Sequence, residues 1–324
     1  MKAGKDKMLK GKVTIIGAGF VGSTIAYTMM LSGLVSEVVL LDINKDKAEG
    51  DALDLNHGMS FVSPVKITGG DDYSCIKGSD MLIITAGVGQ RPGESRIDLL
   101  KRNASVFEDI LNKSLKYCSN DTVLLVVTNP VDILTYIAAK ISGLPKNMVI
   151  GSGTVLDTAR LKFLIGEYTG LDPRNVHTYI IGEHGDTEVA AWSATTVAGI
   201  SLDDYCNICK KCGSGSQICK ETFYVKTRDA AYEIIEKKGA TYYAIALSVK
   251  RIVECIIGNE NSILTVSSLL DGEYGINDIC LSLPTVVNSK GAATILDVPF
   301  SQDERKALTA SADALSKLAR EIGY

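Results

Sequence analysis

The chain has 324 residues, enough for two domains or one large α/β unit. Hydrophobic residues make up 46% of it and charged residues 22%, so an ordinary, well-filled globular core is expected. The formal net charge of −4, without a block of like charge, argues against nucleic acid as a partner. No apolar run reaches the roughly 18 residues that span a membrane, and the polar first residues lack the apolar segment of a secretory signal. We therefore expect a cytoplasmic protein that does not bind membranes.

The first half of the chain alternates between short apolar runs and helical patterns. The runs predict strands at Lys12–Ile16, Glu37–Asp42, Met81–Ile84, Thr122–Val127 and Met148–Ile150. The first helical pattern carries Ile25, Ala26, Met29 and Met30 and stops at Gly33, and the later ones cover 46–56, 94–117 and 131–141. Strands that alternate with helices indicate βαβ units and hence a parallel sheet. Residues 1–150 are therefore predicted to form a doubly wound, nucleotide-binding (Rossmann) domain of the α/β class.

Beyond Gly151 the pattern changes to one with clearer two-residue alternation. This alternation predicts strands at Val176–Ile181 and Ile279–Val287, with helices at 156–166, 222–237 and 242–256. The last helix begins with a capping box, Ser301 with Glu304. Its apolar stripe consists of Leu308, Leu315, Leu318 and Ile322. Residues 151–324 are predicted to form a second domain of mixed α+β structure with antiparallel hairpins.

The glycine-rich sequence Gly17-Ala18-Gly19-Phe20-Val21-Gly22 lies between the first strand and the first helix. Gly17 suits the tight turn, Gly19 lets the backbone approach a pyrophosphate, and Gly22 lets helix and strand pack closely. The helix N-terminus faces the charge of such a diphosphate. Asp42, twenty positions beyond Gly22, ends the next strand, where a carboxylate binds ribose hydroxyls and repels a 2′-phosphate. The pattern predicts NAD rather than NADP as cofactor.

The eight cysteines divide into a scattered set and a cluster. The scattered set, interpreted as small buried hydrophobic residues in a reducing compartment, is Cys75, Cys118, Cys255 and Cys280. The cluster, with the spacing C-x2-C-x2-C-x6-C, is Cys206, Cys209, Cys212 and Cys219. This spacing superficially resembles thiolate ligands of zinc or an iron–sulfur cluster, but a helix with cysteines on neighbouring faces has it too. Nothing else nearby supplies a ligand, so we expect no metal.

Charged residues stand out at four places that follow strands or begin helices. They are the polar, glycine-rich loop 85–96, the stretch 128–132, the pair Asp157 and Arg160, and the segment 180–188 around His184. A loop at the carboxyl edge of a parallel sheet lies where ligands bind, and its glycines allow it to move as a lid. Asp157 and Arg160 share one helix face, a pattern that on its own is more typical of a surface ion pair than of a binding site. His184 is one of three histidines and, taken alone, is more often structural than catalytic.

These stretches together resemble one enzyme family. The sequences GAGFVG, TAGVGQRPGESR, TNPVD, DTAR and GEHGDTE, in this order, are similar to the lactate/malate dehydrogenase family of NAD-dependent 2-hydroxyacid dehydrogenases. The resemblance extends from about Lys12 to the C-terminus. It implies that His184 is the general acid–base, that Asp157 orients it and stabilises its charge, and that Arg160 binds the substrate carboxylate. It also implies that Arg96, on the mobile loop, polarises the substrate carbonyl.

The resemblance implies further contacts as well. Those to substrate are at Gln90, Arg96, Asn129, Asp132, Arg160 and Thr241. Those to the cofactor are at Gly17, Gly19, Val21, Gly22, Asp42, Tyr73, Gly87, Val88, Ser105, Val127, Asn129 and Ser152.

Substrate choice within the family depends on one loop position, which is Gln90 here. Malate dehydrogenases of the family carry an arginine there to pair with the second carboxylate of oxaloacetate. A neutral amide leaves that charge unpaired, which favours pyruvate and L-lactate as the substrate pair. Arg91 follows directly, and a one-residue slip of the loop would present it instead. Malate dehydrogenase therefore remains the alternative enzyme, and a non-catalytic dinucleotide-binding protein is the alternative of another class.

An effector site is also suggested by the resemblance. Many bacterial lactate dehydrogenases bind fructose 1,6-bisphosphate across a subunit interface with a histidine and an arginine. This chain has His177 at the first position but Lys162 at the second. Lysine keeps the positive charge and loses the two-pronged geometry of arginine, so activation by the bisphosphate is an open hypothesis. The relatives also lead us to expect a homotetramer.

Overall fold

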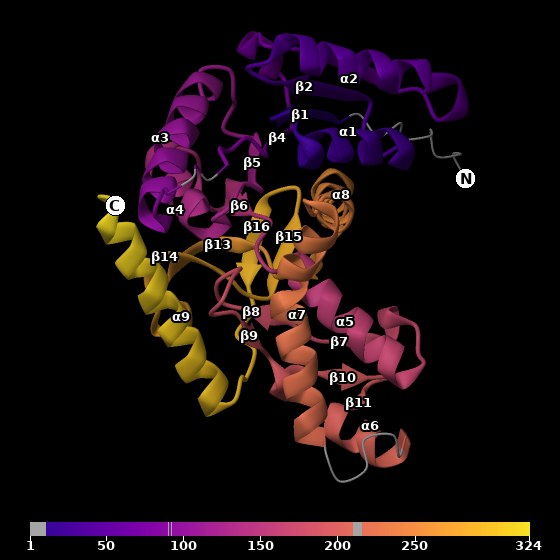
Figure 1. The fold of residues 1–324 in the computed structure, drawn as a ribbon, viewed down its shortest axis with the longest axis vertical. Coiled ribbons are helices and arrows are strands. Elements are labelled where there is room, and N and C mark those ends of the chain that lie inside the picture. The colour runs from indigo at the N-terminus through magenta and orange to yellow at the C-terminus, as the bar shows by residue number, and fades with distance from the viewer. Residues whose placement is uncertain (1–10, 90, 92, 210–215) are drawn as a thin grey trace, which may run out of the picture.

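A central sheet organises the protein. The computed structural model describes residues 11–89, 91, 93–209 and 216–324. The sheet has eight strands in the order β14-β13-β6-β5-β4-β1-β2-β3 (Figure 1). These strands are β1 Lys12–Ile16, β2 Glu37–Leu41, β3 Lys66–Gly70, β4 Met81–Ile84, β5 Val123–Val126, β6 Val149–Gly151, β13 Ser267–Asp271 and β14 Asn277–Ser282. Strands β1 to β6 run parallel, which confirms the doubly wound α/β prediction.

Helices cover both faces of this sheet. In the first half they are α1 Phe20–Ser32, α2 Lys45–His57, α3 Arg96–Ser114 and α4 Val131–Ile141. Successive residues of each strand contribute to different layers, because their side chains alternate between the two faces. Ile16 belongs to the layer with Phe107 of α3, and Ile15 to the layer with Ile25 of α1 and Val249 of the second half. The uninterrupted apolar runs of the sequence reflect this burial on both faces.

Strand β3 was missed by the sequence analysis, because its last two residues, Gly69 and Gly70, weaken the strand pattern. A Cβ added at Gly69 would lie 2.0 Å from the carbonyl oxygen of Ala48 on α2. Glycine therefore permits the close approach of α2 to the outermost parallel strand.

The second half of the chain is mixed, as expected. Its helices are α5 Val155–Thr169, α6 Leu202–Cys209, α7 Ser216–Lys238, α8 Tyr243–Gly258 and α9 Gln302–Glu321. Its remaining strands are β7 Val176–His177, β8 Ile180–Ile181, β9 Val189–Ala190, β10 Thr196–Val197, β11 Ile200–Ser201, β12 Ser262–Leu264, β15 Thr285–Asn288 and β16 Gly291–Ile295. All the pairs that these strands form are antiparallel. Short 3-10 helices occur at η1 Met59–Phe61, η2 Tyr73–Ile76, η3 Lys146–Met148, η4 Pro173–Asn175, η5 Trp192–Ala194 and η6 Glu273–Gly275.

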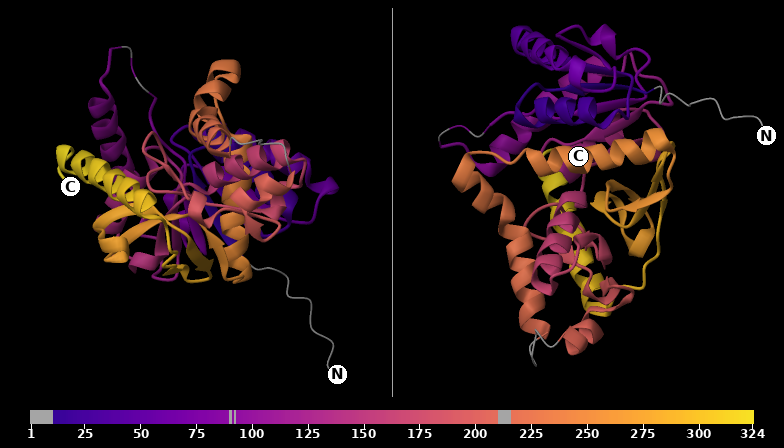
Figure 2. Two further views of the ribbon diagram at one scale, coloured as in Figure 1. Left: turned by 90° about the horizontal axis from the view of Figure 1, so that it is seen from below. Right: turned by 90° about the vertical axis from the view of Figure 1, so that its right-hand side faces the viewer.

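The two halves are joined by shared structure. Strands β13 and β14 extend the central sheet beyond residue 151, and α8 packs on α1. Phe20 stacks on Tyr242 at this contact, with 5.3 Å between ring centroids. The right-hand view of Figure 2 shows α8 lying directly against the first half of the chain. The predicted capping box of α9 is present, with Ser301 and Glu304 bonded to each other's backbone.

Two predicted strands are each divided in two. Val176–Ile181 separates into β7 and β8, because β7 pairs with β10 whereas β8 pairs with β9. Ile279–Val287 is interrupted at Pro284, which has no N–H to donate to a sheet. The part before this proline, β14, belongs to the central sheet, and the part after it, β15, pairs with β12 and β16.

The cysteines follow the predictions only in part. Cys255 and Cys280 are fully buried and Cys118 is half-buried, but Cys75 is exposed on η2, so the prediction for Cys75 was wrong. Cys206 packs in a hydrophobic cluster with residues of α5 and α7. Cys212 and the side chain of Cys209 lie outside the described residues. In the described part of the chain, no group of three or more His, Cys, Asp or Glu side chains is arranged for a metal ion. No helix there is long and apolar enough to cross a membrane.

Candidate active site

The glycine turn after β1 has the geometry of a phosphate-binding turn. Gly17 has a φ of +108°, and a Cβ there would lie 2.7 Å from the backbone nitrogen of Ala86. A Cβ at Gly22 would lie 1.7 Å from the carbonyl oxygen of Gly17. A Cβ at Gly19, in contrast, would have no protein atom within 4 Å and would project into open space at the N-terminus of α1. Two of the glycines are therefore required by packing, and Gly19 leaves room for a ligand.

Asp42 lies at the carboxyl end of β2, beside this turn. Its Oδ2 accepts a hydrogen bond from the N–H of Ala18 at 2.6 Å, and its Oδ1 accepts one from the N–H of Asn44 at 2.8 Å. The carboxylate is thus fixed against the turn, and each oxygen keeps a lone pair for a ribose hydroxyl.

Two neighbouring cavities begin at the glycine turn, and we call them the outer and the inner cavity. The outer cavity, about 550 Å³, extends past Asp42, and the inner one, about 510 Å³, reaches toward α8. The predicted cofactor residues in the outer cavity are Gly17, Gly19, Asp42, Tyr73, Gly87 and Val88. Those in the inner cavity are Gly19, Val21, Gly22, Gly87, Val88, Val127 and Asn129, together with the predicted substrate residue Thr241. Ser105 is exposed and Ser152 is buried, and neither lines these cavities.

The polar loop between β4 and α3 is held near both cavities by two residues of α3. The buried Asn103 accepts a hydrogen bond from the N–H of Val88 at 2.9 Å, and Arg102 donates to the carbonyl of Gly89 at 2.7 Å. Gln90 lies outside the described residues. Arg96 is the first residue of α3, and its side chain also lies outside the described part.

Asp157, Arg160 and His184 form a hydrogen-bonded trio. The Nδ1 of His184 lies 2.5 Å from Oδ2 of Asp157, and Nη1 of Arg160 donates to Oδ1 of the same carboxylate at 2.7 Å. The Asp157 side chain is only 2% exposed, Arg160 13% and His184 24%. Asp157 and Arg160 occupy one face of α5, whereas His184 lies on the loop between β8 and β9. The pair on α5 is therefore buried rather than a surface ion pair.

The charges of this trio shift the pKa values of His184 and Asp157. For His184, burial lowers the pKa, but the negative charge of Asp157 and its hydrogen bond outweigh burial and raise the pKa to about 9. For Asp157, burial raises the pKa, but His184 and Arg160 outweigh it, and the net direction is downward. His184 therefore holds a proton at neutral pH while Asp157 stays ionised.

Asp132 connects the trio to the cavities but does not open into them. It is 2% exposed, its Oδ2 accepts the backbone N–H of His184 at 2.7 Å, and its Oδ1 accepts the hydroxyl of Ser267 at 2.5 Å. Asn129, which lines the inner cavity, lies three positions earlier. The segment at the start of α4 thus supplies Asn129 to the inner cavity and Asp132 to the loop that carries His184. Asp132, for which the resemblance implies a substrate contact, thus lies behind His184 and outside the lining of the two cavities.

The two residues of the expected effector site lie on different elements. Lys162 is on α5 and lines a separate cavity with Arg251 of α8, and burial lowers the pKa of its ammonium group. His177 is on β7 and is exposed.

Sequence reasoning also missed residues of the site. Asn103 is one, because an asparagine in a helix has no pattern that marks it as a loop anchor. Asp109 and Lys113 of α3 are others, and they line the outer cavity as an ion pair. Asp109 and Lys113 are four residues apart, and Val106, which lines the same cavity, lies one turn before Asp109. This spacing places all three on one face of a helix and could have been recognised in the sequence.

Comparisons with known proteins agree with this arrangement. Residues 11–151 match the NAD-binding domain of lactate/malate dehydrogenase, and residues 154–322 match the α/β C-terminal domain of the same family. An L-lactate dehydrogenase of Acetivibrio thermocellus is 59% identical over 98% of both chains. An L-lactate dehydrogenase of Clostridium acetobutylicum is 53% identical over 94% of this chain and 96% of its own length.

Solved structures are equally similar. A lactate dehydrogenase from a deep-sea metagenome has a TM-score of 0.94 at 44% identity, covering 97% of this chain and 99% of its own. A minor L-lactate dehydrogenase of Enterococcus mundtii has a TM-score of 0.91 at 41% identity. The match covers 96% of this chain and 98% of that chain.

The different roles of the glycines give a first prediction. In Gly19→Ala, the added methyl group enters open space where the cofactor diphosphate is expected, so the KM for NADH should rise by about tenfold or more, an effect of ~1.4 kcal/mol. The melting temperature should stay close to that of the unchanged protein. Gly22→Ala is the matched control, because its methyl group clashes with the carbonyl of Gly17 and should lower the melting temperature. Unchanged NADH binding in Gly19→Ala would contradict the placement of the diphosphate.

Proposed function

The chain belongs to the lactate/malate dehydrogenase family, and we propose that it acts there as an NAD-dependent L-lactate dehydrogenase. The overall reaction is pyruvate + NADH + H⁺ ⇌ L-lactate + NAD⁺. The observation that carries the proposal is the trio of Asp157, Arg160 and His184, in which a buried carboxylate holds a protonated imidazole beside a guanidinium. The names of relatives at 53% and 59% identity over nearly the whole chain support the same activity.

NAD fits the residues around the glycine turn. The open space at Gly19 suits the diphosphate, and the fixed carboxylate of Asp42 suits two ribose hydroxyls and disfavours a 2′-phosphate. When bound, the reduced nicotinamide supplies the hydride that goes to the keto carbon. Asn129 and Thr241, at the inner cavity, are the residues that we expect near the nicotinamide and the substrate.

His184 supplies the proton in the direction of pyruvate reduction. The C=O bond of pyruvate breaks to a single bond as the carbon gains the hydride, and its oxygen takes the proton of the imidazolium. Asp157 stays ionised throughout, so it fixes the ring orientation and stabilises the charged form. In lactate oxidation the neutral imidazole accepts the hydroxyl proton, which is the same path in reverse.

Arg160 binds the substrate carboxylate. One of its terminal nitrogens is engaged by Asp157, which anchors the guanidinium and leaves N–H groups for two parallel hydrogen bonds to the substrate. Arg96 is proposed to polarise the substrate carbonyl when the loop closes.

Asp132 acts on the substrate only through His184. Its carboxylate holds the backbone of His184 and is itself held by Ser267 of β13, so it fixes the loop between β8 and β9. We therefore assign it a positioning role in place of the substrate contact expected from the sequence.

The choice of pyruvate over oxaloacetate rests on Gln90. The second carboxylate of oxaloacetate would lie opposite a neutral amide and stay unpaired in the closed site. An unpaired buried charge costs roughly 3–5 kcal/mol, which corresponds to two to four orders of magnitude in kcat/KM. Following NADH absorbance with pyruvate and with oxaloacetate tests the activity directly. We expect turnover with pyruvate to be much faster. Turnover with neither acid would favour a non-catalytic dinucleotide-binding protein.

The loop assignment is tested by two variants of adjacent residues. In Gln90→Arg, the new positive charge pairs with the second carboxylate, so kcat/KM should rise for oxaloacetate and fall for pyruvate. Arg91→Gln is the matched control, and it should leave the ratio of the two kcat/KM values within about threefold of the starting value. If instead Arg91→Gln changes the ratio and Gln90→Arg does not, Arg91 is the residue that contacts the substrate.

We also propose activation by fructose 1,6-bisphosphate through His177 and Lys162. Both residues supply positive charge when protonated, and the partly buried ammonium of Lys162 would gain from an anionic ligand. We expect the bisphosphate to raise the rate at low pyruvate, and Lys162→Ala to abolish this effect. A flat titration with the unchanged protein contradicts the proposal. The homotetrameric state and the cytoplasmic location stay predictions that rest on the family.

A further inference from the structure

Glu188 is a buried carboxyl group next to the site, and the reaction described above does not use it. It is the last residue of the loop that carries His184, directly before β9, and is 3% exposed. Within the described part of the structure, its Oε1 is buried without a hydrogen-bond partner. An ionised carboxylate with an unpaired oxygen is costly in such a place, so the geometry favours the neutral acid.

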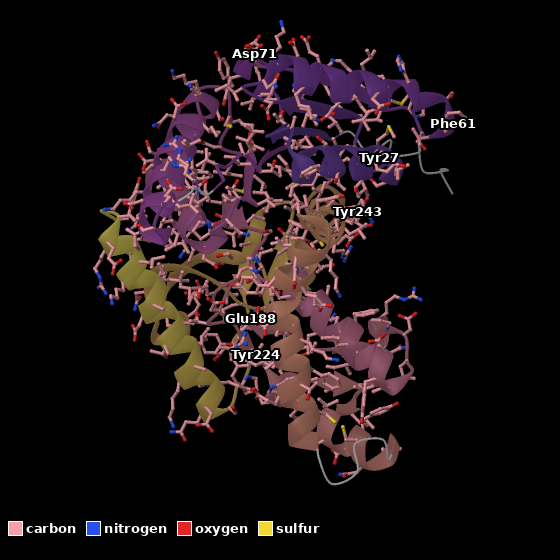
Figure 3. All side chains as sticks on the ribbon, in the orientation of Figure 1. Tyr27, Phe61, Asp71, Glu188, Tyr224 and Tyr243 are labelled. Atoms are coloured by element: carbon pink, nitrogen blue, oxygen red, sulfur yellow. The ribbon has the colours of Figure 1, made fainter. Side chains whose placement is uncertain are left out.

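The Glu188 backbone is fixed by α7. The hydroxyl of Tyr224 donates to the carbonyl oxygen of Glu188 at 2.8 Å, and Figure 3 shows these two residues close together. The hydroxyl therefore satisfies the backbone of Glu188 and not its carboxyl group. The N–H of Glu188 donates to the carbonyl of Gly185 at 3.2 Å and closes the turn that follows His184.

Charged groups of α5, α7 and the loop around His184 act on the Glu188 carboxyl, and α9 contributes one further carboxylate nearby. Asp157 of α5 opposes its ionisation, whereas Arg160 of α5, His184 of the loop and Arg228 of α7 favour it. Arg228 is itself bound to Asp229 at 2.8 Å. On α9, which packs against β9, the carboxylate of Glu304 accepts hydrogen bonds from Ser193 and Ser301. The nearby cations are thus already paired with other carboxylates.

Burial has the largest effect on the pKa of Glu188. It is the largest cause that raises the pKa of Glu188, the charge of Asp157 adds to it, and the result is a pKa of about 8. The group is therefore neutral at pH 7 and loses its proton in a mildly alkaline range.

We propose that Glu188 is a positioning residue of the substrate site, neutral when pyruvate binds, so that Arg160 is available to the substrate carboxylate. Once ionised, Glu188 competes for Arg160 and repels the substrate anion. A neutral acid leaves the electric field of the guanidinium unchanged, whereas a buried anion near it weakens that field at the position of the substrate carboxylate. This proposal rests on the proposed reaction with pyruvate.

Kinetics give the first test. Between pH 7 and pH 9, the KM for pyruvate of the unchanged protein should rise roughly three- to tenfold more than that of Glu188→Gln, which keeps the shape of the neutral acid. Glu221→Gln is the matched control, because Glu221 is an exposed carboxylate on α7, close in sequence to Tyr224. It should behave like the unchanged protein. Equal pH dependence in all three proteins overturns the proposal.

A second measurement does not depend on the reaction. With ¹³C in the glutamate carboxyl carbons, the unchanged protein should show one resonance that titrates near pH 8, present in Glu221→Gln and absent in Glu188→Gln. If no glutamate titrates above pH 6.5, the proposal is overturned even if Glu188→Gln does not fold. If the resonance is present but pyruvate is not reduced, the proposed function is wrong while the neutral state of Glu188 stands.

The same titration has a consequence for stability. A carboxyl whose pKa is raised in the folded state contributes its full stability below its unfolded pKa, near 4.3, and loses it as the pH rises through about 8. The free energy of unfolding should therefore fall more between pH 5 and pH 8 in the unchanged protein than in Glu188→Gln. Equal losses in the two proteins would contradict an ionisable Glu188.

Discussion

The buried carboxylate of Asp157 is the constraint on which the site depends. A charge that is 2% exposed is tolerated only with partners, because an unpaired buried ion is destabilising by several kcal/mol. Each of its oxygens has one: Oδ1 accepts from Arg160, and Oδ2 is bonded to His184. The same requirement that stabilises the fold thus places a guanidinium and a protonated imidazole side by side, which is the arrangement that reduction of a 2-keto acid needs.

The fold supports this trio from several distant segments. Helix α5 begins where the parallel sheet ends at β6, so the first turn of α5 lies at the carboxyl edge of the sheet, where ligands bind in such folds. Asp132, from the start of α4, fixes the backbone of His184, and Ser267 of β13 fixes Asp132. The antiparallel extension of the central sheet therefore contributes to the site, because Asp132 of the first half links Ser267 of β13 to the backbone of His184.

Sequence reasoning predicted the repeating elements and the motif residues well. Helix α4 has the predicted bounds, and the glycine turn lies between β1 and α1 as expected, since both follow from local periodicity. Contacts between distant residues were not predictable in this way. Asp132 and His184 are 52 positions apart, and the motif alone suggested a substrate contact for Asp132. The unpaired Oε1 of Glu188 likewise becomes visible only when its surroundings are known.

The most direct test of the Asp157–His184 pair is a nuclear magnetic resonance titration of the three histidines, compared with the variant His184→Gln. One histidine should keep its proton to about pH 9, because the charge of Asp157 outweighs burial, and its signal should be missing in the variant. If no histidine keeps its proton above pH 8, or if the high-titrating signal persists in His184→Gln, the pairing does not control the proton of this site.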